Sequence, residues 1–286
     1  MRSSASRVTE MSLGWAHKWA RNKCCFLVFG VVFAANAQAQ ARDTILTKSP
    51  LLTSKDALIL GAFTAGTVLI APLDRQIATR LQNPHAQANR SLRVAATGLR
   101  LLGWPGSLAT GAGLYVVGRV DGQSRVQALG LHSVESVLLA DILGGGIKML
   151  AGRQRPFADV DNPYSFQLGR GFSGDRYRSF PSGHTTSAFA FASTLTRESQ
   201  FWWPHATWYV GTIFYGGAAL VGLSRVYDNQ HWASDVLGGA AIGTLVGLKV
   251  VRFTHSHPGN RVDRRLIKGD VRSQTRTIPI GFSFQF

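Results

Sequence analysis

Three short motifs hold the residues of this chain that are best suited to chemistry, and the last of them is the most informative. It reads SRVYDNQHWASD over Ser224–Asp235, with Arg225 six residues before His231. Asp235 follows His231 by four residues, so both lie on one face of a helix. A carboxylate so placed can hold one ring nitrogen and leave the other free to attack. Arg225 could hold an anion in front of the ring.

Two earlier motifs add cations and a helix start. Lys148 and Arg155 lie seven residues apart in KMLAGRQRP, and residues 181–184 read PSGH at the start of an apolar, helix-like run. The first N–H groups of a helix favour an anion, and glycine lets the backbone approach it closely. In chain order the motifs read K-x6-RP, PSGH and SR-x5-H-x3-D.

This order and spacing resembles the type 2 phosphatidic acid phosphatase family, which shares its site with bacterial class A acid phosphatases and vanadium haloperoxidases. Every motif position matches, and the resemblance covers roughly Leu131 to Val251. It implies an all-α fold, in which a bundle of about six core helices holds a phosphate site at one end.

The resemblance also implies a role for each motif residue. His231 would be the nucleophile and form a phosphohistidine, Asp235 would fix its tautomer, and His184 would protonate the leaving alkoxide and then activate water. The phosphate oxygens would be held by Lys148, Arg155, Ser182, Gly183 and Arg225. Since three fixed cations can replace a metal, we expect hydrolysis without a metal ion or other cofactor.

The predicted function is hydrolysis of a lipid phosphate or diphosphate, and three alternatives stay open. A soluble periplasmic acid phosphatase of broad specificity would share the motifs. So would a vanadium-dependent haloperoxidase, although residues 185–187 include no further acid–base histidine after His184. A non-catalytic module for anionic lipid would be expected to lack His184, His231 or Asp235, and all three are present.

Composition points to an anionic partner. The 286 residues carry 31 Lys and Arg against 15 Asp and Glu, which gives a formal charge of +16. Such a balance suits a lipid phosphate or another phosphorylated small molecule. We do not expect a nucleic-acid partner, because no zinc-finger spacing or basic and aromatic platform is present. The sequence does not specify an oligomeric state.

Both ends of the chain differ from its middle. Residues 1–41 contain a short apolar run, Cys24–Ala35, followed by small residues, which predicts a cleaved signal peptide; an uncleaved anchor helix is the alternative. The only two cysteines lie in this run, so the mature chain would have no cysteine–zinc site. Residues 261–286 form a basic linker and a tail, and apolar residues alternate over Arg276–Phe286, which predicts an extended segment.

The helical phosphatase domain is expected over residues 42–260, with its motifs within 148–235. Its predicted helical segments are Ala57–Leu73, Val94–Val117, Gln127–Gly152, Ser182–Arg197, Trp208–Leu223 and His231–Phe253. The second is interrupted by Arg100 and by the residues GWPG at 103–106. A membrane span needs about 20 apolar residues. The first, fifth and sixth segments approach this, whereas the fourth contains four threonines and two serines between His184 and Arg197.

An exported chain with six spans would place the end of the third segment and the start of the fourth in the cytoplasm. The resemblance implies the opposite side, because members of that family that act on lipid phosphates in bacterial inner membranes usually face the periplasm. We therefore favour a periplasmic site in a protein that is associated with the membrane, or integral to it with fewer spans. A six-span protein whose site faces the cytoplasm and a soluble periplasmic protein stay alternatives.

Several polar residues near the motifs are expected to have structural roles. Arg153 and Arg178 lie within or beside the motifs and are predicted to be solvated. Buried or interfacial hydrogen bonds are expected for His132, Glu135 and Asp141 in the third segment. His255 and His257 lack the spacing of a metal site.

Overall fold

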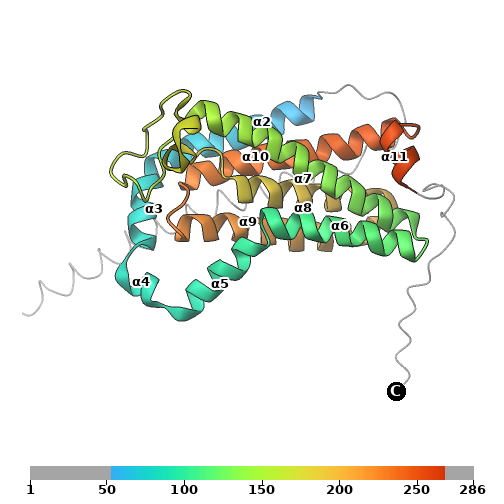
Figure 1. Cartoon of the computed structure of the whole chain (residues 1–286), viewed down its shortest axis with the longest axis horizontal. Coiled ribbons are helices and arrows are strands. Elements are labelled where there is room, and N and C mark those ends of the chain that lie inside the picture. The colour runs from blue at the N-terminus through green and yellow to red at the C-terminus, as the bar shows by residue number, and fades with distance from the viewer. Residues whose placement is uncertain (1–52, 268–286) are drawn as a thin grey trace, which may run out of the picture.

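The computed structural model describes residues 53–267, and the helices in that range form an elongated bundle (Figure 1). Between residues 53 and 267 there is no strand beyond one isolated bridge, from Arg153 to Phe166. The predicted all-α fold is therefore confirmed. The predicted signal peptide and the alternating segment 276–286 lie outside the described residues.

The described helices follow one another with short connections, apart from the long loop between α7 and α8. The α-helices are α2 (Ser54–Ile70), α3 (Asp74–Leu81), α4 (Pro84–Ala88), α5 (Arg90–Leu101), α6 (Trp104–Val120), α7 (Ser124–Ala151), α8 (Gly183–Trp202), α9 (Thr207–Tyr227), α10 (Ala233–Ser256) and α11 (Arg261–Leu266). Short 3-10 turns are η1 (Ala71–Leu73), η2 (Arg170–Ser173), η3 (Asp175–Tyr177) and η4 (Pro204–Ala206).

The predicted helical stretch Val94–Val117 is divided into α5 and α6, close to the glycine and proline residues that interrupt it in the sequence. Gly103 caps the start of α6, and Pro105 lies in its first turn, where the missing N–H of proline is tolerated. A Cβ on Gly106 would lie 2.3 Å from the carbonyl oxygen of Leu101. The chain therefore turns sharply between the two helices.

The start of the predicted C-terminal linker is also helical. Helix α11 is capped by Asn260, whose side chain accepts hydrogen bonds from the N–H groups of Val262 and Asp263. The carbonyl of Leu266, the last residue of α11, accepts a hydrogen bond of 2.7 Å from the side chain of Gln127. This contact ties α11 to the start of α7, at the end of the bundle opposite the α7–α8 loop (Figure 1).

Helices α8 and α10 form the centre of the bundle, and glycines allow them to pack closely. A Cβ on Gly243 of α10 would lie 2.2 Å from the carbonyl oxygen of Thr186 on α8, and one on Gly247 would lie 2.6 Å from that of Ala190. Most side chains of both helices are buried. Since the PSGH motif begins α8 and Asp235 lies in the first turn of α10, this packing fixes two of the three motifs relative to each other.

Within residues 53–267, three helical stretches are long and apolar enough to cross a membrane, namely Ser54–Leu81, Pro204–Tyr227 and Ala233–Ser256. They correspond to the first, fifth and sixth predicted segments, so that expectation is confirmed. Only 17% of the most apolar window in the first stretch and 22% in the second is buried inside the bundle. Such apolar outer faces support association with a membrane.

We predict that Gly243→Ala destabilises the bundle, because the new methyl group would press on backbone atoms of α8 that cannot move alone. Overpacking of this kind costs about 1–3 kcal/mol. Gly217→Ala on α9 is the matched control, since its Cβ would meet no atom within 4 Å. Thermal unfolding in detergent should show a lower midpoint for Gly243→Ala than for Gly217→Ala, and equal midpoints would contradict the packing.

Candidate active site

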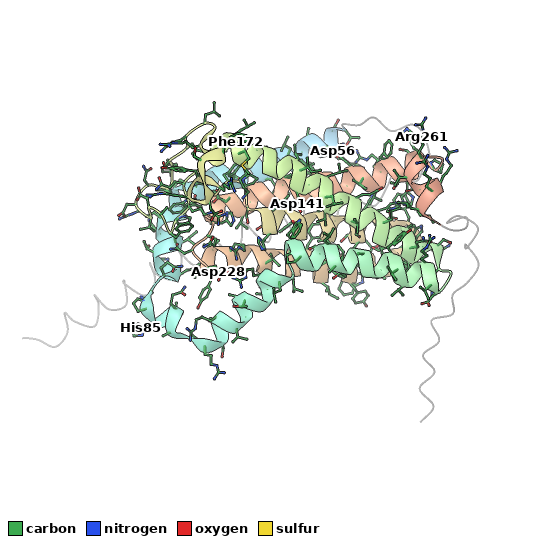
Figure 2. The ribbon with its side chains drawn as sticks, in the orientation of Figure 1. Asp56, His85, Asp141, Phe172, Asp228 and Arg261 are labelled. Carbon is green, nitrogen blue, oxygen red and sulfur yellow. The ribbon has the colours of Figure 1, made fainter. Side chains whose placement is uncertain are left out.

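The structure brings all eight predicted site residues to the same end of the bundle. They lie in the last turn of α7, the α7–α8 loop, the start of α8, the last turn of α9, the α9–α10 loop and the first turn of α10; in chain order they are Lys148, Arg155, Ser182, Gly183, His184, Arg225, His231 and Asp235. Figure 2 shows the labelled Asp228 and Phe172 at this end, and Arg261 at the other.

One hydrogen bond defines the orientation of His231. Its ring Nδ1 lies 2.7 Å from the carbonyl oxygen of Ser179. A carbonyl oxygen can only accept, so Nδ1 must carry the proton and donate it. The other nitrogen, Nε2, then keeps a lone pair. The imidazole is 3% exposed, so this tautomer is held in a buried position.

The Asp235 carboxylate does not hydrogen-bond the ring of His231 directly and instead contacts neighbouring groups. Its Oδ2 lies 3.7 Å from Nδ1 of His231, beyond a hydrogen bond. Oδ2 instead accepts from the hydroxyl of Ser179, at 2.5 Å, and from the N–H of Trp232, at 2.8 Å. The sequence placed Asp235 in direct contact with the ring. The structure differs because a carboxylate in the first turn of α10 also caps that helix.

Arg153 is a site residue that the sequence placed wrongly, at the solvated surface. It is only 2% exposed, and its guanidinium contacts two buried carboxylates: Nη1 lies 2.5 Å from Oδ1 of Asp235, and Nη2 lies 2.9 Å from Oδ2 of Asp74. Asp74 also accepts a hydrogen bond of 2.9 Å from the N–H of Ser234. This network joins the start of α3 to the start of α10.

A weak signal for Arg153 was its place inside the first motif, between Lys148 and Arg155. No sequence signal pointed to Asp74, which is 79 residues from Arg153.

Lys148 connects the end of α7 to the start of α8. Its ammonium donates to the carbonyl oxygens of Pro181, at 2.7 Å, and Arg178, at 3.0 Å. These bonds use two of its three N–H donors and place a positive charge beside the PSGH motif. Burial, followed by the positive charge of Arg155, lowers the pKa of Lys148 to about 8.

The two arginines of the predicted phosphate clamp are paired with carboxylates. Arg155 Nη2 lies 2.8 Å from Oδ1 of Asp175, and Arg225 Nη1 lies 2.6 Å from Oδ2 of Asp228. Arg225 Nε is buried and has no hydrogen-bond partner within residues 53–267. An unsatisfied buried donor costs about 1–3 kcal/mol, which a bound anion would offset.

The start of α8 offers neutral donors and free space. The Ser182 N–H is occupied by the carbonyl of Asp235, at 3.1 Å, and its hydroxyl accepts from that of Thr185, at 2.8 Å. A Cβ built on Gly183 would meet no heavy atom within 4 Å. The first turn of this 20-residue helix is therefore approachable at Gly183, where helix N–H groups favour an anion.

Both histidines are held neutral at pH 7. Burial, followed by the positive charge of Arg225, lowers the pKa of His184 to about 4. Burial lowers the pKa of His231 to about 3, against the opposing effect of Asp235 and together with the charge of Lys148. A neutral His231 with its proton on Nδ1 is a competent nucleophile.

Other polar residues singled out in the sequence contact partners elsewhere in the bundle. His132 Nδ1 lies 2.5 Å from Glu198, and His255 Nε2 lies 2.7 Å from the same carboxylate. Asp141 accepts a hydrogen bond of 2.7 Å from the hydroxyl of Ser187. Within residues 53–267, no group of three or more His, Cys, Asp or Glu side chains is placed to hold a metal ion.

The region that contains the three motifs is similar to known proteins. Residues 129–257 match the family model of the PAP2 superfamily. The chain is 35% identical to a lipid A 1-phosphatase of Porphyromonas gingivalis, over 44% of this chain and 24% of that protein. It is 30% identical to an undecaprenyl-diphosphatase of Sulfolobus acidocaldarius, over 50% of this chain and 63% of that one. The matches therefore span less than two thirds of either relative.

A solved structure resembles the whole bundle. It is the crystal structure of a transmembrane PAP2-type phosphatidylglycerolphosphate phosphatase from Bacillus subtilis, with a TM-score of 0.50 and 23% sequence identity. The match covers 71% of this chain and 98% of that one. At this identity the likeness describes the fold, and it agrees with the helical bundle in Figure 1.

We predict that Arg153→Met strongly destabilises the protein, because two buried carboxylates would lose the cation between them. Removing one partner of a buried ion pair costs about 3–5 kcal/mol. Arg75→Met is the control: Arg75 pairs with Asp161 at 2.6 Å, but both side chains are more than half exposed. An exposed pair contributes about 0–1 kcal/mol. Similar unfolding midpoints for the two variants would contradict the proposed role of Arg153.

We also predict that the affinity for inorganic phosphate falls as the pH rises through about 8, where Lys148 loses its proton. Below that pH the ammonium is charged and can bind the anion; above it the neutral amine loses a charge-assisted interaction of about 1.5–3 kcal/mol, or roughly tenfold or more in affinity. Titration calorimetry between pH 7 and about pH 9.5 would measure this. Lys148→Arg should remove the step, and an unchanged step in that variant would assign it to another group.

Proposed function

Because residues 129–257 match the family model of the PAP2 superfamily, we propose that this chain hydrolyses a lipid phosphate or diphosphate through a phosphohistidine, without a metal ion. The observation that carries this proposal is the hydrogen bond from Nδ1 of His231 to the carbonyl of Ser179, which leaves a lone pair on Nε2. The cations Lys148, which is half-buried, and Arg155, which is buried, are close enough to affect the pKa of this ring.

In the first step, Nε2 of His231 attacks the phosphorus atom. A nitrogen–phosphorus bond forms, the bond from phosphorus to the leaving oxygen breaks, and His184 gives that oxygen a proton. His184 must be protonated for this step, although its pKa is about 4 without ligand. The negative charge of a bound phosphate would raise that pKa, so substrate binding itself would help to charge the acid.

In the second step, water attacks the phosphohistidine. His184, now neutral, takes a proton from the water, the nitrogen–phosphorus bond breaks, and its electron pair returns to Nε2 of His231. Inorganic phosphate leaves. Throughout both steps Lys148, Arg155 and Arg225 would balance the charge on the three outer oxygens of the phosphoryl group, which is the main requirement of phosphoryl transfer.

A lipid substrate is supported by the apolar exterior of the bundle and by the relatives. Helix α9 exposes Trp208 and Ile213, and α2 exposes Leu58 and Leu69. The relatives named above are a lipid A 1-phosphatase and an undecaprenyl-diphosphatase. We assign the site to the periplasmic side because residues 1–41 predict an export signal.

We predict that the purified protein releases phosphate from short-chain phosphatidate in the presence of a chelator, and that His231→Ala reduces the rate by about 1,000-fold or more, as expected for loss of a nucleophile. His205→Ala, at an exposed histidine in η4, should keep the wild-type rate. Acid-labile labelling of the wild type during turnover would detect the phosphohistidine. Loss of activity with chelator, or a fully active His231→Ala variant, would refute the mechanism.

A soluble aryl phosphate should be offered in parallel, because its rate relative to phosphatidate separates a lipid enzyme from a phosphatase of broad specificity. Equal or faster hydrolysis of the aryl ester would favour the second.

A further inference from the structure

A fourth cation, Arg100, lies near the site but belongs to none of the three motifs. It is in the last turn of α5, outside the matched region 129–257. Its side chain is exposed, and no hydrogen bond or ion pair of its guanidinium is found among residues 53–267. The motif arginines Arg155 and Arg225, by contrast, are buried and paired with carboxylates.

The turn after Arg100 rests directly against His184. The N–H of Gly103 donates to the carbonyl oxygen of Arg100, at 3.1 Å. A Cβ on Gly103 would lie 2.6 Å from Cδ2 of His184, so the backbone of this turn contacts the imidazole ring. The positive charge of Arg100 is also one of those that lower the pKa of His184, after burial and the charges of Arg225 and Lys148.

The position beside His184 matters because His184 is the group that meets the leaving oxygen in the proposed mechanism. A lipid alcohol is neutral once protonated, so it gains little from a neighbouring cation. A lipid monophosphate leaves with its negative charge, and a guanidinium can hold its oxygens with charge-assisted hydrogen bonds. A cation beside His184 therefore favours a diphosphate substrate over a monophosphate.

On the basis of the proposed function, we propose that Arg100 binds the leaving phosphate of a lipid diphosphate and so gives the site a preference for diphosphates over monophosphates. Nε2 of His231 forms a bond to the terminal phosphorus, and the bond from that phosphorus to the bridging oxygen breaks. The electron pair stays on the bridging oxygen, which leaves as part of the lipid monophosphate beside Arg100. Water then releases inorganic phosphate from His231 as before.

Helix α5 is suited to present this cation to a lipid substrate. It carries basic residues and has exposed apolar side chains, including Leu92, Val94 and Leu101. A helix of this composition can lie at the level of the lipid headgroups, with apolar residues directed to the acyl chains and arginines to phosphates. Figure 1 shows α5 projecting from the bundle at the end that holds the site.

The test compares farnesyl diphosphate with farnesyl monophosphate in mixed micelles, so that the lipid chain is constant. We expect Arg100→Gln to lower the ratio of kcat/KM for diphosphate to that for monophosphate by about tenfold or more, the value of one charge-assisted hydrogen bond. Arg93→Gln is the matched control, because Arg93 is exposed on α5 two turns earlier. It should leave the ratio at its wild-type value, and Arg100→Lys should recover part of it.

A binding measurement gives a second readout that needs no turnover. Inorganic pyrophosphate should bind more weakly to Arg100→Gln than to the wild type, by a larger factor than inorganic phosphate does. An unchanged ratio of kcat/KM, or equal losses for both substrates and both anions, would overturn the role of Arg100. A wild type that hydrolyses neither farnesyl substrate would instead count against the proposed function, and the inference would fall with it.

Discussion

The rest of the site depends on the contacts that surround the buried carboxylate of Asp235. A buried carboxylate is stable only when cations and hydrogen-bond donors surround it. Here Arg153 supplies the charge, while Ser179 and Trp232 supply donors. Each contact fixes a different segment: the end of the first motif, the residues before PSGH and the start of α10. Because the Ser179 carbonyl holds the ring of His231, the orientation of the proposed nucleophile depends on the contacts that this carboxylate makes.

The positively charged side chains of the site lie close together and repel one another when no substrate is bound. Nearby acceptor groups offset this repulsion. Arg155 and Arg225 use nearby carboxylates, and Lys148 uses backbone carbonyls. The partner of Arg155, Asp175, has a side chain that is 65% exposed, so exchanging it for a phosphate oxygen costs little. A phosphate that enters the site would therefore replace weak solvent-exposed pairing with several charge-assisted hydrogen bonds.

The sequence predicted the motif residues of the site better than the residues that hold them in position. Lys148, His184 and His231 lie in contiguous motifs, and the structure brings those motifs to one end of an all-α bundle, as expected. The role of Arg153 depends on Asp74, and no local pattern reveals a pair so far apart in sequence. The contact between His231 and the Ser179 carbonyl was also beyond prediction, because backbone groups carry no residue-specific signal. The split between α5 and α6 lies at the interruption that glycine and proline make after Leu101 in the sequence, because the preference of these residues for turns outweighs the apolar pattern.

The chain divides the proposed reaction between two regions. The groups that would act on the transferred phosphoryl group lie within residues 148–235, inside the region that matches the PAP2 superfamily. Arg100, for which we propose a contact with the leaving group, and the turn at Gly103, which rests against His184, lie outside that region. Proteins that share the first region can therefore share phosphoryl chemistry and still differ in the group they release. The relatives fit this division, since they include both a lipid A 1-phosphatase and an undecaprenyl-diphosphatase. On this argument, substrate preference should be sought in helix α5 and the turn after it, since the motifs alone do not distinguish the two classes.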